Sequence, residues 1–331
     1  MRMADELPLT TALGDGIVQI RLPMAGNPLR YINGYVLEDD DGLTLVDCGW
    51  KGDDVLAALH AGLAEHGKAL GDISRLLMTH FHFDHYGLAG TLLAAGVPML
   101  GMHERDWAVL QRIGVARDAD DEIADKWITA NGYTAPDGES TDSPQHHWYD
   151  LVPPTRYIND DDQLGRLTAM WTPGHSPGHL CFLDRRSGKL LTGDHILDPV
   201  TPHVGIWHDH GRDPLGEYMA SLQRVGNTGT TGTLPAHGEP FVDTNRRVEE
   251  LLAHEIEREA QVFDALQTRG RASAAEIARA LQWRRRGDSF DMLPAAHQQF
   301  AVAETIAHLE HLRNDGEIDR DRSVDPIVYV I

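Results

Sequence analysis

The sequence predicts an α/β protein followed by a smaller helical region. In residues 1–242, short apolar runs alternate with apolar residues at helical spacing, a pattern typical of sheets covered by helices. Residues 243–331 lack that alternation and contain long charged segments with a single apolar stripe. We therefore expect a large amino-terminal domain and a small carboxyl-terminal domain.

The amino-terminal part supplies the first strands and helices. Apolar runs flank a turn of consecutive aspartates that ends at Gly42, and Val55, Leu59 and Leu63 then recur at helical spacing. A later helical pattern ends at Gly96. The expected strands are residues 16–20, 35–37, 43–46, 76–78 and 98–101, and the expected helices are residues 53–65 and 86–95.

Residues 104–160 form a long insertion without a clear period. Insertions of this length often act as lids or binding loops, but their aromatic residues can equally anchor them to the core. Both interpretations stay open for this sequence. The aromatic residues concerned are Trp107, Trp127, Tyr133, Trp148 and Tyr149.

Three helices and a hairpin are expected at the carboxyl end. The first helix carries the apolar stripe and ends at Gly270. Ser273 and Glu276 form a capping box that starts the second helix. The expected helices are residues 245–268, 273–281 and 297–314, and the expected strands are residues 317–319 and 327–330.

The strongest functional signal is the segment THFHFDH, which runs from Thr79 to His85 directly after an apolar run. Alternate side chains of an extended segment share a face, so His80, His82 and Asp84 can converge on one side. His85 then lies where the chain turns into a helix. Neutral imidazole and carboxylate suit zinc, iron and manganese. A lone histidine is usually structural, but this dense order of ligand types indicates a metal site.

Three further ligand candidates follow apolar runs and stand beside glycine. His175 lies in TPGHSPGH, Asp194 in TGDH and His237 in PAHG. Strand ends followed by glycine-rich turns present their side chains to a common cleft. The sequence alone therefore gives seven candidates, which are His80, His82, Asp84, His85, His175, Asp194 and His237.

These motifs, together with LVDCG at residues 45–49, resemble the metallo-β-lactamase superfamily over residues 15–245, and in particular its glyoxalase II-like hydrolases. The resemblance implies an αββα sandwich and two divalent metal ions, zinc by default with iron or manganese as alternatives. It implies that one ion is held by His80, His82 and His175, and the other by Asp84, His85 and His237, with Asp194 bridging them. Leu88 and Ala236 depart from the family pattern but remove no ligand.

The resemblance also implies roles beside the metal ions. Asp47 matches a position that orients a ligand imidazole. Two metal ions that share a water can lower its pKa toward about 7, which gives a bridging hydroxide as nucleophile. Asp84 is then the catalytic candidate that carries the proton to the leaving group. Because residues 201–210 closely follow Asp194, the candidates for substrate contact are His203, Trp207 and His208.

The carboxyl-terminal helices and hairpin resemble the winged-helix appendage of some metallo-β-lactamase-fold proteins. Such modules can bind DNA, but acidic residues outnumber arginines after Asp243, and the third helix has few cations for phosphate contacts. The run of three arginines at 284–286 fits a solvated loop. We expect a structural or dimerising role, with a homodimer as the commonest oligomer.

Composition limits the classes of partner. Lys and Arg number 29 against 51 Asp and Glu, and the formal net charge of −22 opposes non-specific binding to nucleic acid or anionic membranes. The sequence shows no apolar run long enough for a transmembrane helix and no signal-peptide core at its start. Cys48 and Cys181 lie in strand-like runs, which predicts buried thiols in a reducing cytoplasm.

The sequence and the resemblance together favour a hydrolase of carbonyl ester-type bonds in a small molecule, with thioesters first and lactones or carboxylic esters next. Two alternatives stay open. One is phosphodiester cleavage by the same two-metal chemistry, which the acidic charge disfavours. The other is a regulatory protein that binds metal without catalysis, which the intact ligand set disfavours.

Overall fold

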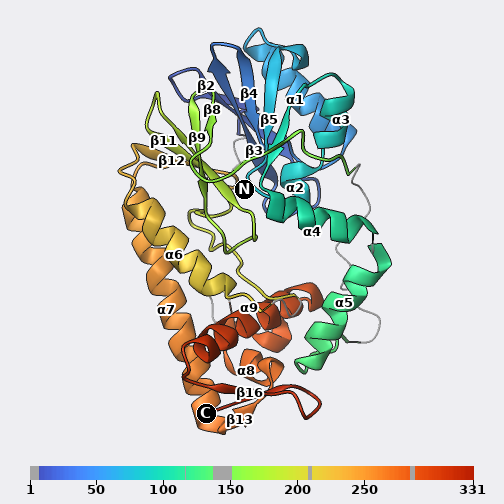
Figure 1. Cartoon of the computed structure of the whole chain (residues 1–331), viewed down its shortest axis with the longest axis vertical. Coiled ribbons are helices and arrows are strands. Elements are labelled where there is room, and N and C mark those ends of the chain that lie inside the picture. The colour runs from blue at the N-terminus through green and yellow to red at the C-terminus, as the bar shows by residue number, and fades with distance from the viewer. Residues whose placement is uncertain (1–6, 116, 137–150, 208–210, 284–287) are drawn as a thin grey trace, which may run out of the picture.

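The computed structural model describes residues 7–115, 117–136, 151–207, 211–283 and 288–331. Two β-sheets pack face to face, and helices cover the outer face of each sheet (Figure 1). The predicted αββα sandwich is therefore confirmed. None of the helices within these ranges is long and apolar enough to cross a membrane.

The first sheet has seven strands in sequence order, antiparallel from β1 to β4 and parallel from β4 to β7. Leu59, Leu92 and Leu110 are fully buried against its outer face. They come from helices α1 (Asp53–Glu65), α3 (Ala89–Ala94) and α4 (Glu104–Val115). The strands are β1 (Thr10–Ala12), β2 (Ile17–Pro23), β3 (Tyr31–Asp39), β4 (Gly42–Val46), β5 (Ile73–Leu77), β6 (Leu100–Met102) and β7 (Arg156–Tyr157).

The second sheet has the strand order β12-β11-β10-β9-β8, with only β11 and β12 parallel among these neighbours. Its inner face meets the first sheet in a core that includes Tyr35, Leu77 and Phe182. Its outer face packs on α6 (Pro214–Gly226) and α7 (Thr244–Arg269). The strands are β8 (Gln163–Leu164), β9 (Leu167–Trp171), β10 (Leu180–Asp184), β11 (Lys189–Gly193) and β12 (Gly232–Pro235).

The single helix predicted at residues 86–95 is wrong, because the chain forms α2 (Phe83–Tyr86) and α3 with a break between them. A Cβ at Gly87 would lie 2.5 Å from the Cα of Trp50, so the chain passes directly against that backbone. The amide of Leu88 donates to the carbonyl of Gly49 instead of continuing the helix. Contact with another segment therefore overrides the local helical pattern.

The insertion at residues 104–160 is more regular than its sequence suggests, because it contains α4 and α5 (Arg117–Ala130). Trp107 and Tyr133 are buried, and the Tyr133 hydroxyl donates to Gln298 Oε1 at 2.9 Å. These two aromatic residues anchor the insertion to the core and to the carboxyl-terminal region. Trp148 and Tyr149 lie outside the described residues, and a lid role for the insertion stays a prediction.

The described part of the carboxyl-terminal region contains the expected helices and three more strands than predicted, which are β13, β14 and β15. Ser273 and Glu276 form the expected capping box at the start of α8 (Ala274–Ala280). The sheet has three strands in the order β13-β17-β16, because the short segment Arg271–Ala272 pairs with the last strand. The elements are β13 (Arg271–Ala272), β14 (Gln282–Trp283), β15 (Asp288–Ser289), α9 (Ala295–Asn314), β16 (Asp319–Asp321) and β17 (Val328–Val330).

This region and the second sheet share one apolar cluster, so α7, α8 and α9 pack continuously with α6 (Figure 1). The winged-helix interpretation and a domain boundary at residue 242 both stay predictions. Cys48 and Cys181 are free and buried, as expected. Burial raises the pKa of the Cys181 thiol to about 12, which suits a core residue better than a reactive thiol.

A buried ion pair joins Arg166 and Asp184 within the second sheet, and Arg166 also reaches β3 of the first sheet. Both side chains are almost fully buried, with the Arg166 guanidinium 2.6 Å from Asp184 Oδ2, and Arg166 also donates to the carbonyl of Glu38. We expect Arg166→Ala to lower the free energy of unfolding by about 3–5 kcal/mol, because it leaves the carboxylate buried without its partner. Urea denaturation measures this. Arg156→Ala, which breaks an exposed pair with Asp162, is the control and should cost below about 1 kcal/mol.

Candidate metal centre

The seven predicted ligands come together at one end of the sandwich, each just beyond the end of a strand. His80 and His82 follow β5, and Asp84 and His85 lie in α2. The other three follow β9, β11 and β12, and they are His175, Asp194 and His237. One detail of the prediction is wrong, because Asp84 lies in a helix and does not share an extended face with the two histidines before it.

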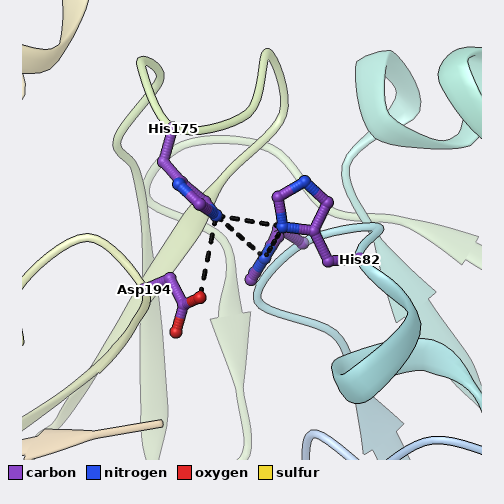
Figure 2. A group of neighbouring side chains, drawn as sticks. His82, His175 and Asp194 are labelled. Atoms are coloured by element: carbon purple, nitrogen blue, oxygen red, sulfur yellow. Dashed lines mark hydrogen bonds and ion pairs between the residues drawn. The ribbon is translucent and has the colours of Figure 1, made fainter. Parts of the chain in front are cut away.

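The first ligand group consists of His80, His82, His175 and Asp194, whose possible ligand atoms all lie within 4.8 Å of one another. His175 Nε2 is 3.2 Å from His80 Nε2 and 3.1 Å from His82 Nδ1, and it faces Asp194 Oδ2 at 3.7 Å. Figure 2 shows His82, His175 and Asp194 pointing toward a common space from separate loops.

Hydrogen bonds fix which ring nitrogen of His175 and of His80 faces the centre. His175 Nδ1 donates to the carbonyl of His203 at 2.8 Å, so its Nε2 carries the lone pair. The Thr79 hydroxyl donates to Asp47, which leaves the threonine oxygen to accept from His80 Nδ1. His80 Nε2 therefore also presents a lone pair. Nitrogen lone pairs that face one another repel, and a bound cation between them removes that conflict.

The second group consists of Asp84, His85 and His237. His237 Nε2 lies 3.2 Å from Asp84 Oδ2, and its Nδ1 donates to the carbonyl of Tyr31. His85 Nδ1 donates to Asp47 Oδ2 at 2.8 Å, which turns Nε2 toward the centre. This hydrogen bond is the contact through which Asp47 would orient a ligand imidazole, and that role stays a prediction.

Asp194 belongs to the first group and also faces the second. Its Oδ2 faces His175 in the first group, while its Oδ1 lies 3.6 Å from both His85 Nε2 and His237 Nε2 in the second. A carboxylate with one oxygen toward each group can coordinate two metal ions at once. This geometry supports the predicted bridging role.

The residues present fit a pair of divalent cations. His85 Nε2 and Asp194 Oδ1 are buried, and neither has a hydrogen-bond partner among the described residues. Buried polar atoms are rarely left unpaired, so both positions call for a further partner such as a cation. Neutral imidazoles and carboxylates are the donors that zinc, iron and manganese take.

The electrostatics of the two groups differ. Burial and neighbouring histidines lower the pKa of His80 well below its usual value, and burial and His175 lower that of His82 to about 3, so these imidazoles are neutral. In the second group, burial lowers the pKa of His85, but Asp47, Asp194 and Asp84 together raise it well above its usual value. The local field there favours positive charge, which a metal ion would supply.

Two backbone features hold the loops in this arrangement. Asp47 has a left-handed conformation (φ 58°), and its carboxylate accepts from the backbone amide and the hydroxyl of Thr79. Aspartate tolerates this conformation better than most residues. Gly193, before Asp194, also has positive φ, and a Cβ there would lie 2.7 Å from Thr79. A side chain at position 193 would displace both loops.

The loop after Asp194 lies beside the first group and contacts the carboxyl-terminal region. His203 supplies the carbonyl for His175, and its ring Nε2 donates to the carbonyl of Phe300 at 3.1 Å. The ring of Trp207 lies 5.1 Å from that of Phe300, which is 45% exposed. Of the predicted substrate contacts, His203 therefore touches a candidate ligand, and the ring of Trp207 lies 5.8 Å from the ring of His203. The third, His208, lies outside the described residues.

One residue next to the centre was missed by the sequence analysis. Asp106 at the start of α4 is fully buried, and it accepts hydrogen bonds from Phe81, Ser176 and Gly178 in the two loops of the first group. Burial raises its pKa to about 7, although its three donors lower it. The sequence around Asp106 has no ligand spacing, so only the tertiary structure shows its position.

The chain is similar in sequence and in fold to known proteins. A family model described as the metallo-beta-lactamase superfamily matches residues 27–237. Among solved structures, the chain is similar to a metallo-beta-lactamase family protein from Thermus thermophilus, with 30% identity, a TM-score of 0.80 and coverage of 96% of this chain and 99% of that chain. It is also similar to a beta-lactamase domain protein from Burkholderia ambifaria, with 27% identity, a TM-score of 0.79 and coverage of 99% and 95%.

Two named relatives span most of this chain. The Bacillus subtilis (strain 168) protein named "Probable metallo-hydrolase YqjP" is 24% identical over an alignment of 322 residues that covers 92% of this chain and 94% of that protein. The atrochrysone carboxyl ACP thioesterase of Aspergillus fumigatus is 26% identical over an alignment of 313 residues that covers 90% of this chain and 83% of that protein. These likenesses extend into the carboxyl-terminal region.

Proposed function

This chain belongs to the metallo-beta-lactamase superfamily, and from that premise we propose that it is a dinuclear metal-dependent hydrolase of thioesters in a small-molecule substrate. The observation that carries the proposal is Asp194, whose two oxygens face two separate sets of ligand atoms. We assign His80, His82 and His175 to one ion and Asp84, His85 and His237 to the other, with zinc as the expected metal.

Two divalent cations held by these residues would supply Lewis acidity at the substrate carbonyl and a water with its pKa lowered toward about 7. The side chains of the protein do the remaining work. Asp47, Thr79 and the carbonyl of His203 fix the imidazole tautomers, so that lone pairs point inward before the substrate arrives. This preorganisation avoids rearrangement during the reaction.

Asp84 is the residue that we assign to proton transfer. Although burial raises its pKa, the charges of His85 and His237 lower it to about 2, so the side chain is an ionised carboxylate. Its side chain is 18% exposed, more than those of the histidines beside it in the second group, which gives it access to a substrate. It would hold the proton on a carboxylate oxygen and deliver it to the leaving group.

Three considerations favour a thioester over the other substrates of this superfamily. A thiolate is a good leaving group, so a site with a single proton carrier is sufficient. A relative that shares most of the chain is named as a thioesterase. The net charge of −22 disfavours a polyanionic nucleic acid, which is the substrate that a phosphodiesterase would require.

A substrate panel tests the proposal. Protein of measured metal content would be assayed with acyl-CoA and glutathione thioesters, lactones, aryl esters and a phosphodiester. We expect the highest kcat/KM for a thioester and about two metal ions per chain. Full metal content without turnover of any substrate would instead favour a metal-binding regulatory protein, and preferential phosphodiester cleavage would contradict the choice of bond.

We also propose that Phe300 and Trp207 form an apolar wall for the acyl group, because both rings pack beside His203 next to the first ligand group. Phe300→Ala should raise KM for a bulky apolar acyl thioester by about 10-fold and leave KM for an acetyl thioester nearly unchanged. Met292→Ala, which removes an exposed side chain from the segment before α9, is the control. Equal effects on both substrates would contradict the wall.

A further inference from the structure

We propose that Asp106 is a positioning residue that holds the first ligand group together, an inference that rests on metal binding by that group. The two loops involved leave different sheets. One loop follows β5 and carries His80 and His82, whereas the other follows β9 and carries His175. A metal ion bound by all three imidazoles requires these loops to keep a fixed separation, and Asp106 contacts both of them.

The contacts of Asp106 reach the immediate neighbours of the ligands. Its Oδ2 accepts from the backbone amide of Phe81 at 3.0 Å and from the hydroxyl of Ser176 at 2.8 Å. Its Oδ1 accepts from the backbone amide of Gly178 at 2.5 Å. Phe81 lies between the two histidines of the first loop, and Ser176 directly follows His175. One carboxylate thus connects the backbones that carry three ligands.

A carboxylate suits this position better than any neutral side chain. It offers two oxygens that only accept, whereas an asparagine amide would present an NH2 group to one set of the donors. Burying a carboxylate is costly unless it is well hydrogen-bonded, and Asp106 is fully buried. Its three donors offset part of that cost, and they do so only while both loops stay in place, so the carboxylate and the loop geometry depend on each other.

The start of α4 packs against β9 through contacts with Trp171. The Arg105 guanidinium lies 4.6 Å from the ring centroid of Trp171, and the ring of His103 stacks on the same indole at 5.4 Å. A Cβ on Gly178 would lie 2.7 Å from the Asp106 backbone nitrogen, so the second loop passes directly against the helix. Asp106 is therefore held at a fixed point and can restrain the loops.

The test measures metal affinity on the full chain. Metal-free protein would be titrated with Zn2+ in competition with a chromophoric chelator. We expect Asp106→Asn to weaken binding of one of the two ions by about 10- to 100-fold and to leave the other ion unchanged. His175→Ala and His237→Ala serve as references for loss of the first and the second ion, and the Asp106→Asn curve should follow that of His175→Ala.

Asp184→Asn is the matched control, because Asp184 is also a fully buried aspartate but pairs with Arg166 instead of contacting the ligand loops. It should lower stability and leave both affinities unchanged. If Asp106→Asn does not fold, Ser176→Ala removes one donor and should weaken the same ion by about threefold or more. Wild-type affinities in the folded variants would overturn the inference. A wild-type protein that binds no metal would instead overturn the proposed function.

Discussion

Replacing Asp194 with alanine should reduce thioester hydrolysis by about 10³-fold or more and should lower the metal content from about two ions per chain to about one or fewer. The reason is geometric. Asp194 Oδ2 faces the first ligand group and Oδ1 faces the second, so a single substitution removes a ligand from both. Elemental analysis and steady-state kinetics on the same preparation measure the two effects together.

Two controls separate this outcome from general damage. Asp198→Ala changes an aspartate four residues away that pairs with Arg246 at the surface, and it should keep both metal content and activity. Wild-type protein treated with a chelator should lose its activity and regain it when Zn2+ is added, whereas the Asp194→Ala variant should not recover. Two tightly held ions and full turnover in that variant would contradict the bridging role.

Replacing Asp84 with asparagine should lower kcat by about 10²- to 10⁴-fold, which is the usual contribution of a proton-transfer residue. Asparagine keeps the shape and one oxygen that can still coordinate a metal ion, but it cannot accept the proton. Single-turnover kinetics with thioesters of decreasing leaving-group pKa measure the effect. The loss should shrink as the leaving group needs less protonation.

Metal content decides how that result is interpreted. A variant that loses one ion together with activity would show that Asp84 acts as a ligand. A variant that keeps both ions and full turnover would remove the proton-transfer role altogether. The slow variant that we expect keeps both ions and depends strongly on the leaving group.

The candidate centre could be predicted in large part from the sequence, because ligand chemistry imposes a recognisable order on few residue types. THFHFDH, His175, Asp194 and His237 stand out for that reason, and the structure brings all seven side chains together. The strand ends that precede them were also predictable, since buried strands are short apolar runs followed by glycine.

The parts that the sequence analysis missed depend on contacts between distant segments. The break between α2 and α3 arises from the backbone of Trp50, and the strand β13 exists only because β17 lies beside it. Asp106 is one acidic residue among many until the fold buries it against two loops. Helix α6 is different, because its start could have been predicted from the sequence. The signals are an N-cap aspartate and a proline at the first helical position, Asp213 and Pro214, followed by apolar residues at helical spacing, Leu215, Tyr218 and Leu222.

The contact between His203 and α9 has a consequence for how this protein can evolve. The loop whose His203 carbonyl fixes the tautomer of His175 is held by Phe300, which accepts from the His203 ring, and by Ala303, which accepts from the Ile206 amide, roughly 100 positions further along the chain. Substitutions in α9 can therefore change the position of the His203 carbonyl and, through it, the orientation of His175. An exchange of the carboxyl-terminal region between relatives would therefore also replace contacts that support the candidate metal centre.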